Sequence, residues 1–247
     1  PFQTSRRKYQ QLKATNIPRD SALKLDERSA ELRDGLYTAL ERAVRDALAE
    51  SAHSGLVVDV GAGRGELIQR LAARDIECFG IDPEADCVAM ASRHGRCVQG
   101  GIEDLAQVLG DQSPQVIVCS HVLEHLNSPF DSIHTMYQSG AHELVLAVPN
   151  VLRSARLIRA MLGKRRGDHP EHVYAWGHAE FATLVKRAGY IPVEWYVDRV
   201  TVNPFSNRVG GFLTSKLKFF EENTLARLHP TLSSSLILRC RREDHSS

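Results

Sequence analysis

The feature that most constrains this fold is a strand–turn–helix pattern that begins near residue 55 and recurs along the chain. The apolar run Leu56–Val60 leads into a glycine-rich turn, Gly61–Gly65, and a helical stretch follows over residues 66–73. Strands that alternate with helices imply right-handed crossovers, and these build a mainly parallel sheet covered on both faces. The sequence therefore predicts an α/β fold.

Further apolar runs extend this pattern to seven strands. The other predicted strands are residues 77–81, 96–98, 115–119, 143–148, 191–198 and 235–241. Helices are predicted over residues 84–93 and 178–188, the second closed by Gly189. The predicted fold class is α/β, with a doubly wound, seven-stranded, Rossmann-like sheet, helices on both faces and an N-terminal helical extension.

The chain ahead of the first strand has a different character. Leu32, Leu36, Leu40, Ala43 and Ala47 form one apolar stripe, which predicts an amphipathic helix with no strand before it. We expect residues 1–50 to form an extension or lid that lies against a core or over a site. Residues 51–247 form the main domain. The long segment at about residues 200–232 is either a helical insertion or a plain surface connection.

Composition excludes several classes of protein. The 31 Lys and Arg residues nearly balance the 30 Asp and Glu residues, which argues against a dedicated duplex-DNA binder. A hydrophobic content of 43% is that of an ordinary globular chain, and no apolar run approaches the roughly 20 residues that span a bilayer. The N-terminal charges have no apolar core behind them, so no secretory signal is predicted. The five scattered cysteines are typical of thiols in a reducing compartment, so we expect a cytoplasmic protein.

The spacing of the glycines indicates the kind of ligand. A dinucleotide site has the pattern GxGxxG, whereas this turn is GxGxG, and Glu66 stands where the last glycine would be. A carboxylate there does not suit a pyrophosphate, and the acidic Asp59 before the turn suits a cation. Asp82, at the end of the second strand, is placed to accept hydrogen bonds from ribose hydroxyls. The ligand inferred is a positively charged nucleoside without a pyrophosphate.

S-adenosylmethionine has these properties, and at this point the chain resembles the class I S-adenosylmethionine-dependent methyltransferases. The matching segments, in family order over roughly residues 50–200, are 57–67, 80–84, 116–126, 148–150 and 178–190. A dehydrogenase or a non-enzymatic Rossmann-like domain remains the alternative. The resemblance implies S-adenosylmethionine as cofactor and S-adenosylhomocysteine as product.

The resemblance also implies a set of cofactor-binding residues. Those at the methionine end of the cofactor would be Asp59, Gly61, Ala62, Gly63, Ser120 and His121. Those around the ribose and adenine would be Asp82, Pro83, Gly101, Ile102 and Glu103. Many family members carry Asp where this chain has Gly101, so Glu103 or Asp104 is left to contact the adenine amino group.

A cluster of histidines follows the fourth strand. His121, Glu124 and His125 match the inverted zinc-protease motif HxxEH, but that motif needs a helical context that is not predicted here. In the small-RNA 2′-O-methyltransferases and the ubiquinone-pathway O-methyltransferases, a Glu-x-x-Glu-His turn binds a divalent metal. Here His121 replaces the first Glu. We predict no metal, and the candidate ligands for one are Glu124, His125 and His172, a donor set that suits Zn²⁺, Fe²⁺ or Mn²⁺.

Methyl transfer to an oxygen also requires removal of a proton, and an imidazole is suited to that near neutral pH. His121, His125 and His172 are therefore the predicted catalytic residues of an O-methyltransferase acting on a small molecule of sugar or natural-product type. A basic stretch, Arg153–Arg166, favours an anionic acceptor or is a solvated helix face. The alternatives are a metal-dependent RNA 2′-O-methyltransferase and a module that binds the cofactor without catalysis. The sequence leaves the oligomeric state open.

Overall fold

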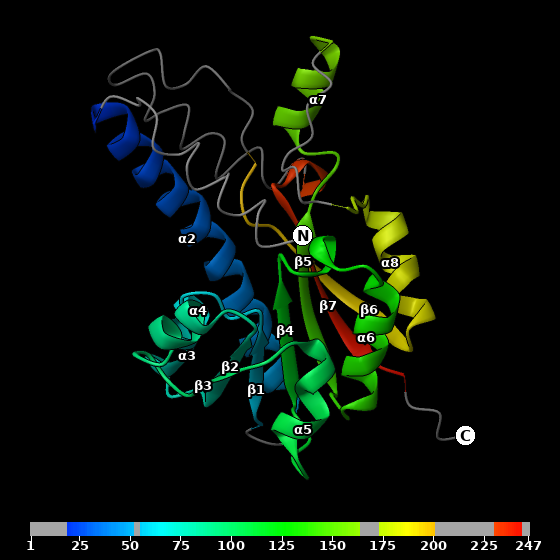
Figure 1. The fold of residues 1–247 in the computed structure, drawn as a ribbon. Coiled ribbons are helices and arrows are strands. Elements are labelled where there is room, and N and C mark those ends of the chain that lie inside the picture. Colours follow the sequence, from blue (N-terminus) through cyan, green and yellow to red (C-terminus); the bar gives the residue numbers. More distant parts are fainter. Residues whose placement is uncertain (1–18, 52–54, 164–172, 201–229, 244–247) are drawn as a thin grey trace. The chain divides into compact units, whose positions relative to one another are not determined.

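The computed structural model describes residues 19–51, 55–163, 173–200 and 230–243. The chain divides into two compact units, residues 1–34 and residues 35–247. In the first unit, the described residues 19–34 are helical and form the N-terminal half of α2 (Arg19–Glu50). The second unit contains the rest of α2 and a sheet with helices on both faces (Figure 1).

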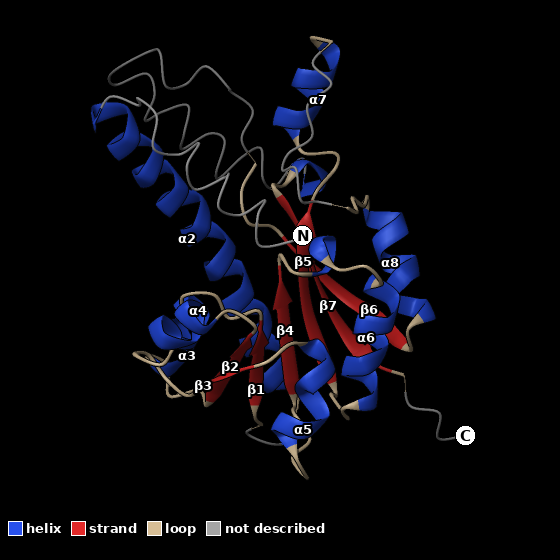
Figure 2. Cartoon of the chain, viewed as in Figure 1, coloured by secondary structure: helices blue, strands red, loops and turns tan. Residues whose placement is uncertain are grey.

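The sheet has seven strands in the order β3-β2-β1-β4-β5-β7-β6, and Figure 2 shows them as one continuous layer. The strands are β1 (Val57–Val60), β2 (Cys78–Asp82), β3 (Cys97–Gln99), β4 (Val116–Ser120), β5 (Glu143–Pro149), β6 (Tyr190–Tyr196) and β7 (Ser235–Arg242). Strands β1 to β5 pair in parallel, whereas β7 is antiparallel to both β5 and β6. The predicted doubly wound sheet is confirmed. Each predicted strand begins and ends within two residues of the observed strand.

Successive side chains along each strand point to opposite faces of the sheet, so the core has two layers. The helices that follow α2 are α3 (Glu66–Ala72), α4 (Ala85–Ala91), α5 (Leu105–Leu109), α6 (Pro129–Gln138), α7 (Ser154–Met161) and α8 (His178–Arg187). Val116, Val118 and Val145 face the layer that contains α2 and α3, whereas Ile117 and Leu144 face the layer that contains α5, α6 and α8. Strands whose two faces are both buried read as continuous apolar runs, which is why the sequence marks them clearly.

The C-terminal half of α2 is part of the sheet-packed core. Leu40, Ala43 and Ala47 of the predicted stripe are fully buried, and Leu36 is half-buried against the same cluster. The side chain of Leu32 lies outside the described residues. Residues 35–50 therefore pack on the sheet, in the same compact unit as the strands.

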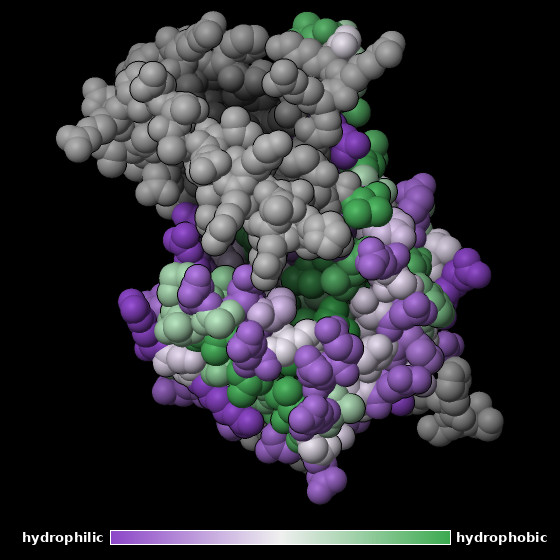
Figure 3. Space-filling model, in the orientation of Figure 1, coloured by the Kyte–Doolittle hydropathy of each residue, from purple (hydrophilic) through white to green (hydrophobic). Residues whose placement is uncertain are grey.

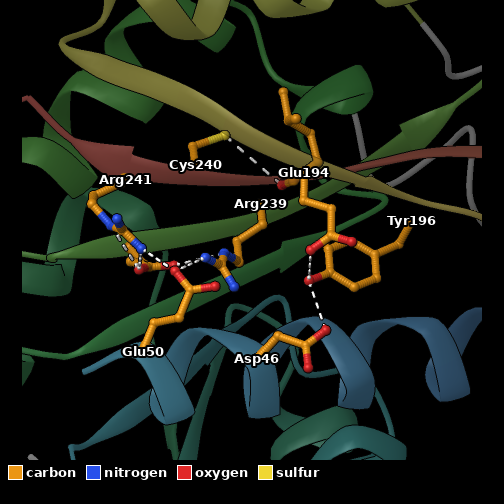
Figure 4. Close-up of polar contacts among 9 residues, drawn as sticks. Asp46, Glu50, Glu194, Tyr196, Arg239, Cys240 and Arg241 are labelled. Atoms are coloured by element: carbon orange, nitrogen blue, oxygen red, sulfur yellow. Dashed lines mark hydrogen bonds and ion pairs between the residues drawn. The ribbon is translucent and has the colours of Figure 1, made fainter. Parts of the chain in front are cut away.

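Ion pairs fix the end of α2 to β7. Figure 4 shows Glu50 reaching Arg239 and Arg241, and Tyr196 of β6 reaching Asp46 of α2. Arg239 is fully buried, and its Nε also lies 3.1 Å from an oxygen of the buried Glu143. A guanidinium removed from water must be balanced by carboxylates, so the buried Arg239 needs both Glu50 and Glu143 in place.

Part of the predicted architecture falls outside the described chain. Of the insertion predicted at about residues 200–232, residues 201–229 lie outside the described residues. Pro230–Leu232 form a 3₁₀ turn ahead of β7. Within the described ranges, no helix combines the length and the apolar character needed to cross a membrane.

Candidate functional site

The glycine turn follows β1 at the carboxyl edge of the parallel strands. Gly61, Gly63 and Gly65 have φ angles of 76°, 56° and 83°, a left-handed conformation that glycine adopts without steric cost. The N–H groups of Gly61 and Ala62 donate to the carbonyl oxygen of Ile81, at 2.8 and 3.2 Å. These bonds fix the turn against the end of β2, and α3 begins directly after it.

Asp82 is the last residue of β2 and lies behind the turn. Its Oδ2 accepts the N–H of Gly63 at 2.9 Å, and its Oδ1 accepts the N–H of Glu84 at 2.9 Å. Each carboxylate oxygen has a second lone pair, so both can still accept a hydroxyl. A Cβ added to Gly63 would meet no atom within 4 Å, so the turn is open beside this carboxylate. The arrangement fits a nucleoside whose ribose hydroxyls donate to Asp82.

Asp59 supplies a second acidic group beneath the turn. It lies within β1 and is 4% exposed. Burial, and to a smaller extent the nearby carboxylates of Asp82 and Glu66, together raise the pKa of its carboxyl to about 7. A cation beside the turn would relieve this repulsion, which fits a ligand that carries an ammonium group.

The segment after β3 contains the predicted adenine-binding residues. The N–H of Gly101 donates to Asp104 Oδ2 at 2.8 Å and closes a 3₁₀ turn in which Ile102 is buried. The carboxylate of Glu103 lies against Gly101, in the place that a Cβ on that glycine would take. Glu103 and Asp104 therefore both place a carboxylate beside Gly101. Pro83 is held nearby, where its carbonyl oxygen accepts Gln99 Nε2 at 3.1 Å.

The turn after β4 holds the predicted histidine cluster. His121 Nδ1 lies 3.0 Å from Glu124 Oε1, and Glu124 is fully buried in the 3₁₀ turn Leu123–His125. Its second oxygen, Oε2, has no hydrogen-bond partner among the described residues. His125 is exposed and Ser120 is half-buried. His121 and Glu124 are in contact, whereas His172 lies outside the described residues.

A metal site is not assembled in the described part of the chain. No group of three or more His, Cys, Asp or Glu side chains comes close enough there to bind a metal ion. Of the three candidate ligands, Glu124 and His125 are neighbours in one turn and His172 is not described. The described donors alone therefore do not fit a metal site.

The predicted basic stretch is described only in part, and two aromatic residues follow it in sequence before α8. Arg156 and Arg159 belong to α7 and Arg153 precedes it, while residues 164–166 of the basic stretch are not described. Tyr174 stacks on Trp176 with ring centroids 5.6 Å apart. Trp176 also lines a cavity of about 590 Å³ between α6 and α8. In the view of Figure 3, hydrophobic residues line a recess next to polar side chains of the described chain.

Comparison with known proteins gives the family. Residues 31–194 match the family described as "Methyltransferase domain". The chain is a class I S-adenosylmethionine-dependent methyltransferase. Its cofactor is S-adenosylmethionine, and the predicted resemblance is confirmed. The residues that bind the cofactor stay a prediction.

Two relatives of this methyltransferase are named ubiquinone biosynthesis O-methyltransferase. The one from Cupriavidus pinatubonensis is 26% identical over 168 residues, which is 61% of this chain and 65% of that protein. The one from Burkholderia thailandensis is 26% identical over 170 residues, 62% of this chain and 70% of that protein. This methyltransferase thus spans about 65% of the length of the first relative.

A solved structure shows the same fold. The magnesium protoporphyrin IX methyltransferase from Synechocystis PCC 6803, with bound S-adenosylhomocysteine, has a TM-score of 0.59 and 15% sequence identity. The match covers 97% of this chain and 95% of that one.

Proposed function

We propose that this methyltransferase transfers the methyl group of S-adenosylmethionine to a hydroxyl oxygen of a small-molecule acceptor. The similarity to two proteins named O-methyltransferase, over more than 160 residues of this chain, is the observation that carries the proposal. The arrangement after β4 supports it, since an exposed histidine follows directly on the buried Glu124 at the carboxyl edge of the sheet. The basic residues at α7 favour an acceptor that carries negative charge.

The cofactor would lie beside the glycine turn and Asp82. Asp82 would accept the ribose hydroxyls, and the open side of Gly63 would allow the methionine end to approach the backbone. Asp59 would balance the α-ammonium group. The adenine would lie beside Pro83, Gly101, Ile102 and Glu103, where Glu103 takes the place of the missing Asp.

When bound, S-adenosylmethionine supplies a methyl group activated by a sulfonium sulfur. The chain's part is to align the acceptor oxygen with that methyl group and to remove the hydroxyl proton. We assign the removal of this proton to the imidazole of His125, with His172 as the other candidate. As the new carbon–oxygen bond forms, the carbon–sulfur bond breaks, its electron pair stays on sulfur, and the proton moves to the imidazole.

Replacing His125 with alanine tests this assignment. We expect kcat to fall by about 100-fold or more, because general-base catalysis contributes about 10²–10⁴ to a rate. Affinity for S-adenosylhomocysteine should change less than threefold. The assay is transfer of radiolabelled methyl to a panel of phenols and sugars, with His134→Ala as control, since His134 is an exposed histidine on α6.

Three results would contradict the proposal. Turnover by His125→Ala within a few-fold of wild type would show that His125 is not the general base. Methyl transfer by the wild-type protein to RNA, with none to the small acceptors, would show that the substrate is RNA. Cofactor binding without any turnover would show that the protein is not a catalyst.

The pH dependence of cofactor binding tests the role of Asp59. Its protonated form is neutral and cannot balance an ammonium group, so affinity should fall as the pH drops through about 7. We expect S-adenosylhomocysteine to bind about tenfold more weakly for each pH unit below 7. Calorimetry at pH 6, 7 and 8 measures this. Asp59→Asn should bind weakly with a flat profile, and an equally flat profile in wild type would disprove the role.

A further inference from the structure

The turn after β4 has an unusual backbone conformation. His121 has a φ of 55°, a left-handed conformation that costs energy for a residue with a side chain. Its N–H donates to the carbonyl oxygen of Ala147 in β5 at 2.8 Å. Such a conformation persists only where surrounding contacts determine it, so the contacts of the His121 ring are informative.

Both ring nitrogens of His121 face protein atoms. Nδ1 lies 3.0 Å from Glu124 Oε1, and Nε2 lies 3.2 Å from the hydroxyl of Ser235, which opens β7. Glu124 comes three residues after His121, whereas Ser235 is 114 residues away in sequence. The ring is therefore held from two sides by elements that the chain brings together only on folding.

Asp198 lies behind Ser235 and completes the arrangement. Its Oδ1 accepts the backbone N–H groups of Arg199, Ser234 and Ser235 at 2.6, 3.0 and 3.3 Å. Asp198 thus fixes the first residues of β7, and with them the hydroxyl that meets the His121 ring.

The conformation of His121 determines where the next residue lies. The side chain of Val122 lies over Gly61, and its Cγ2 takes the place that a Cβ on that glycine would need. Gly61 belongs to the turn that we assign to the methionine end of the cofactor. A rotation at His121 would therefore move Val122 away from the glycine turn and open one wall of that site.

We propose that Ser235 and Asp198 are positioning residues for the cofactor site, which act through His121 to hold Val122 against Gly61. The proposal rests on the proposed placement of the cofactor at the glycine turn. It concerns binding of the cofactor and not the chemistry of the acceptor, so it can be tested without knowing the acceptor.

Ser235→Ala is the first test. Because it releases His121 Nε2, we expect the dissociation constant of S-adenosylhomocysteine to rise about fivefold to tenfold. On any acceptor that the panel of phenols and sugars identifies, the KM for S-adenosylmethionine should also rise similarly while kcat stays within threefold. Asp198→Asn should act in the same direction, because it perturbs the carboxylate that fixes Ser235. Thermal unfolding of each variant checks that the fold is retained.

Ser139→Ala is the matched control. The Ser139 hydroxyl donates to the carbonyl oxygen of Met136 at 2.7 Å, at the end of α6, so the same chemical change removes a hydrogen bond that does not involve His121. We expect no change in cofactor affinity.

A double-mutant cycle separates positioning from a general structural effect. If Ser235 acts through His121, Ser235→Ala should have less than a twofold effect in a His121→Ala background. His121→Asn should restore part of the affinity, since asparagine tolerates a left-handed φ better than alanine does.

The proposal is overturned if Ser235→Ala binds S-adenosylhomocysteine as wild type does, or if it has the same effect with and without His121. Absence of O-methylation by a wild-type protein that still binds S-adenosylhomocysteine would overturn only the proposed function. Absence of binding by wild type would overturn the cofactor site and this proposal with it.

Discussion

Replacing Asp82 with alanine should weaken the binding of S-adenosylhomocysteine by about 100-fold or more. The carboxylate is 6% exposed and is fixed by the N–H groups of Gly63 and Glu84, so it is already oriented for the ribose hydroxyls. Hydrogen bonds to a charged group contribute about 1.5–3 kcal/mol each, and about 1.4 kcal/mol is a factor of ten in affinity. Calorimetric titration measures the loss.

Asp86→Ala is the control for this experiment. Asp86 is an exposed aspartate on α4, four residues beyond Asp82, so the variant loses the same charge near the site without touching the turn. Its affinity should stay within twofold of wild type. If Asp82→Ala binds the ligand within threefold of wild type, the ribose does not contact this carboxylate.

The second large effect concerns stability. Glu143→Gln should lower the free energy of unfolding by about 3 kcal/mol, because it leaves the buried Arg239 without one of its carboxylates. Arg241 also loses a charged partner, since its Nη2 lies 3.0 Å from Glu143 Oε1. At about 2–4 °C per kcal/mol for a domain of this size, the unfolding temperature should fall by about 10 °C in a thermal melt.

Two further variants show whether the buried charge causes the loss. Glu50 contacts the same two arginines but is half exposed, so Glu50→Gln should have a much smaller effect. The double variant Glu143→Leu/Arg239→Met removes both buried charges and should recover most of the stability, as apolar replacements of buried ion pairs often do. A Glu143→Gln protein that unfolds within 2 °C of wild type would contradict this account.

The strands were predictable because their signal is local. Runs such as Gln115–Cys119 are apolar on both faces, since both faces of the sheet are covered by helices. The antiparallel direction of β7 was not predictable in this way, because it depends on how the chain returns from β6 to β5.

Two observed helices, α5 and α6, have no counterpart among the predicted elements, and α7 is predicted only as one alternative for the basic stretch. The start of α6 does have a sequence signal. Ser128 caps the helix by accepting the N–H of Asp131 at 3.4 Å, and Pro129 follows as the first helical residue, a combination typical of helix N-termini. The α5 helix has five residues, too few for an apolar periodicity to be recognised.

In the candidate site, too, the residues that the sequence predicts are those with a local sequence pattern. The glycine turn and Asp82 were found from sequence because their spacing reflects one local strand–turn–helix unit. Ser235 and Asp198 were missed as partners of His121, because they are far from it in sequence and have no motif of their own. The buried second oxygen of Glu124 was also beyond sequence reasoning, since burial depends on tertiary packing.

A crystal structure of the wild-type protein with S-adenosylhomocysteine tests the central claim most directly. The account predicts the ribose hydroxyls within hydrogen-bond distance of Asp82, the α-amino group toward Asp59, and the amino-acid end of the ligand beside the turn at Gly61 and Gly63. Ligand density away from the glycine turn, or a ribose that does not reach Asp82, would contradict it.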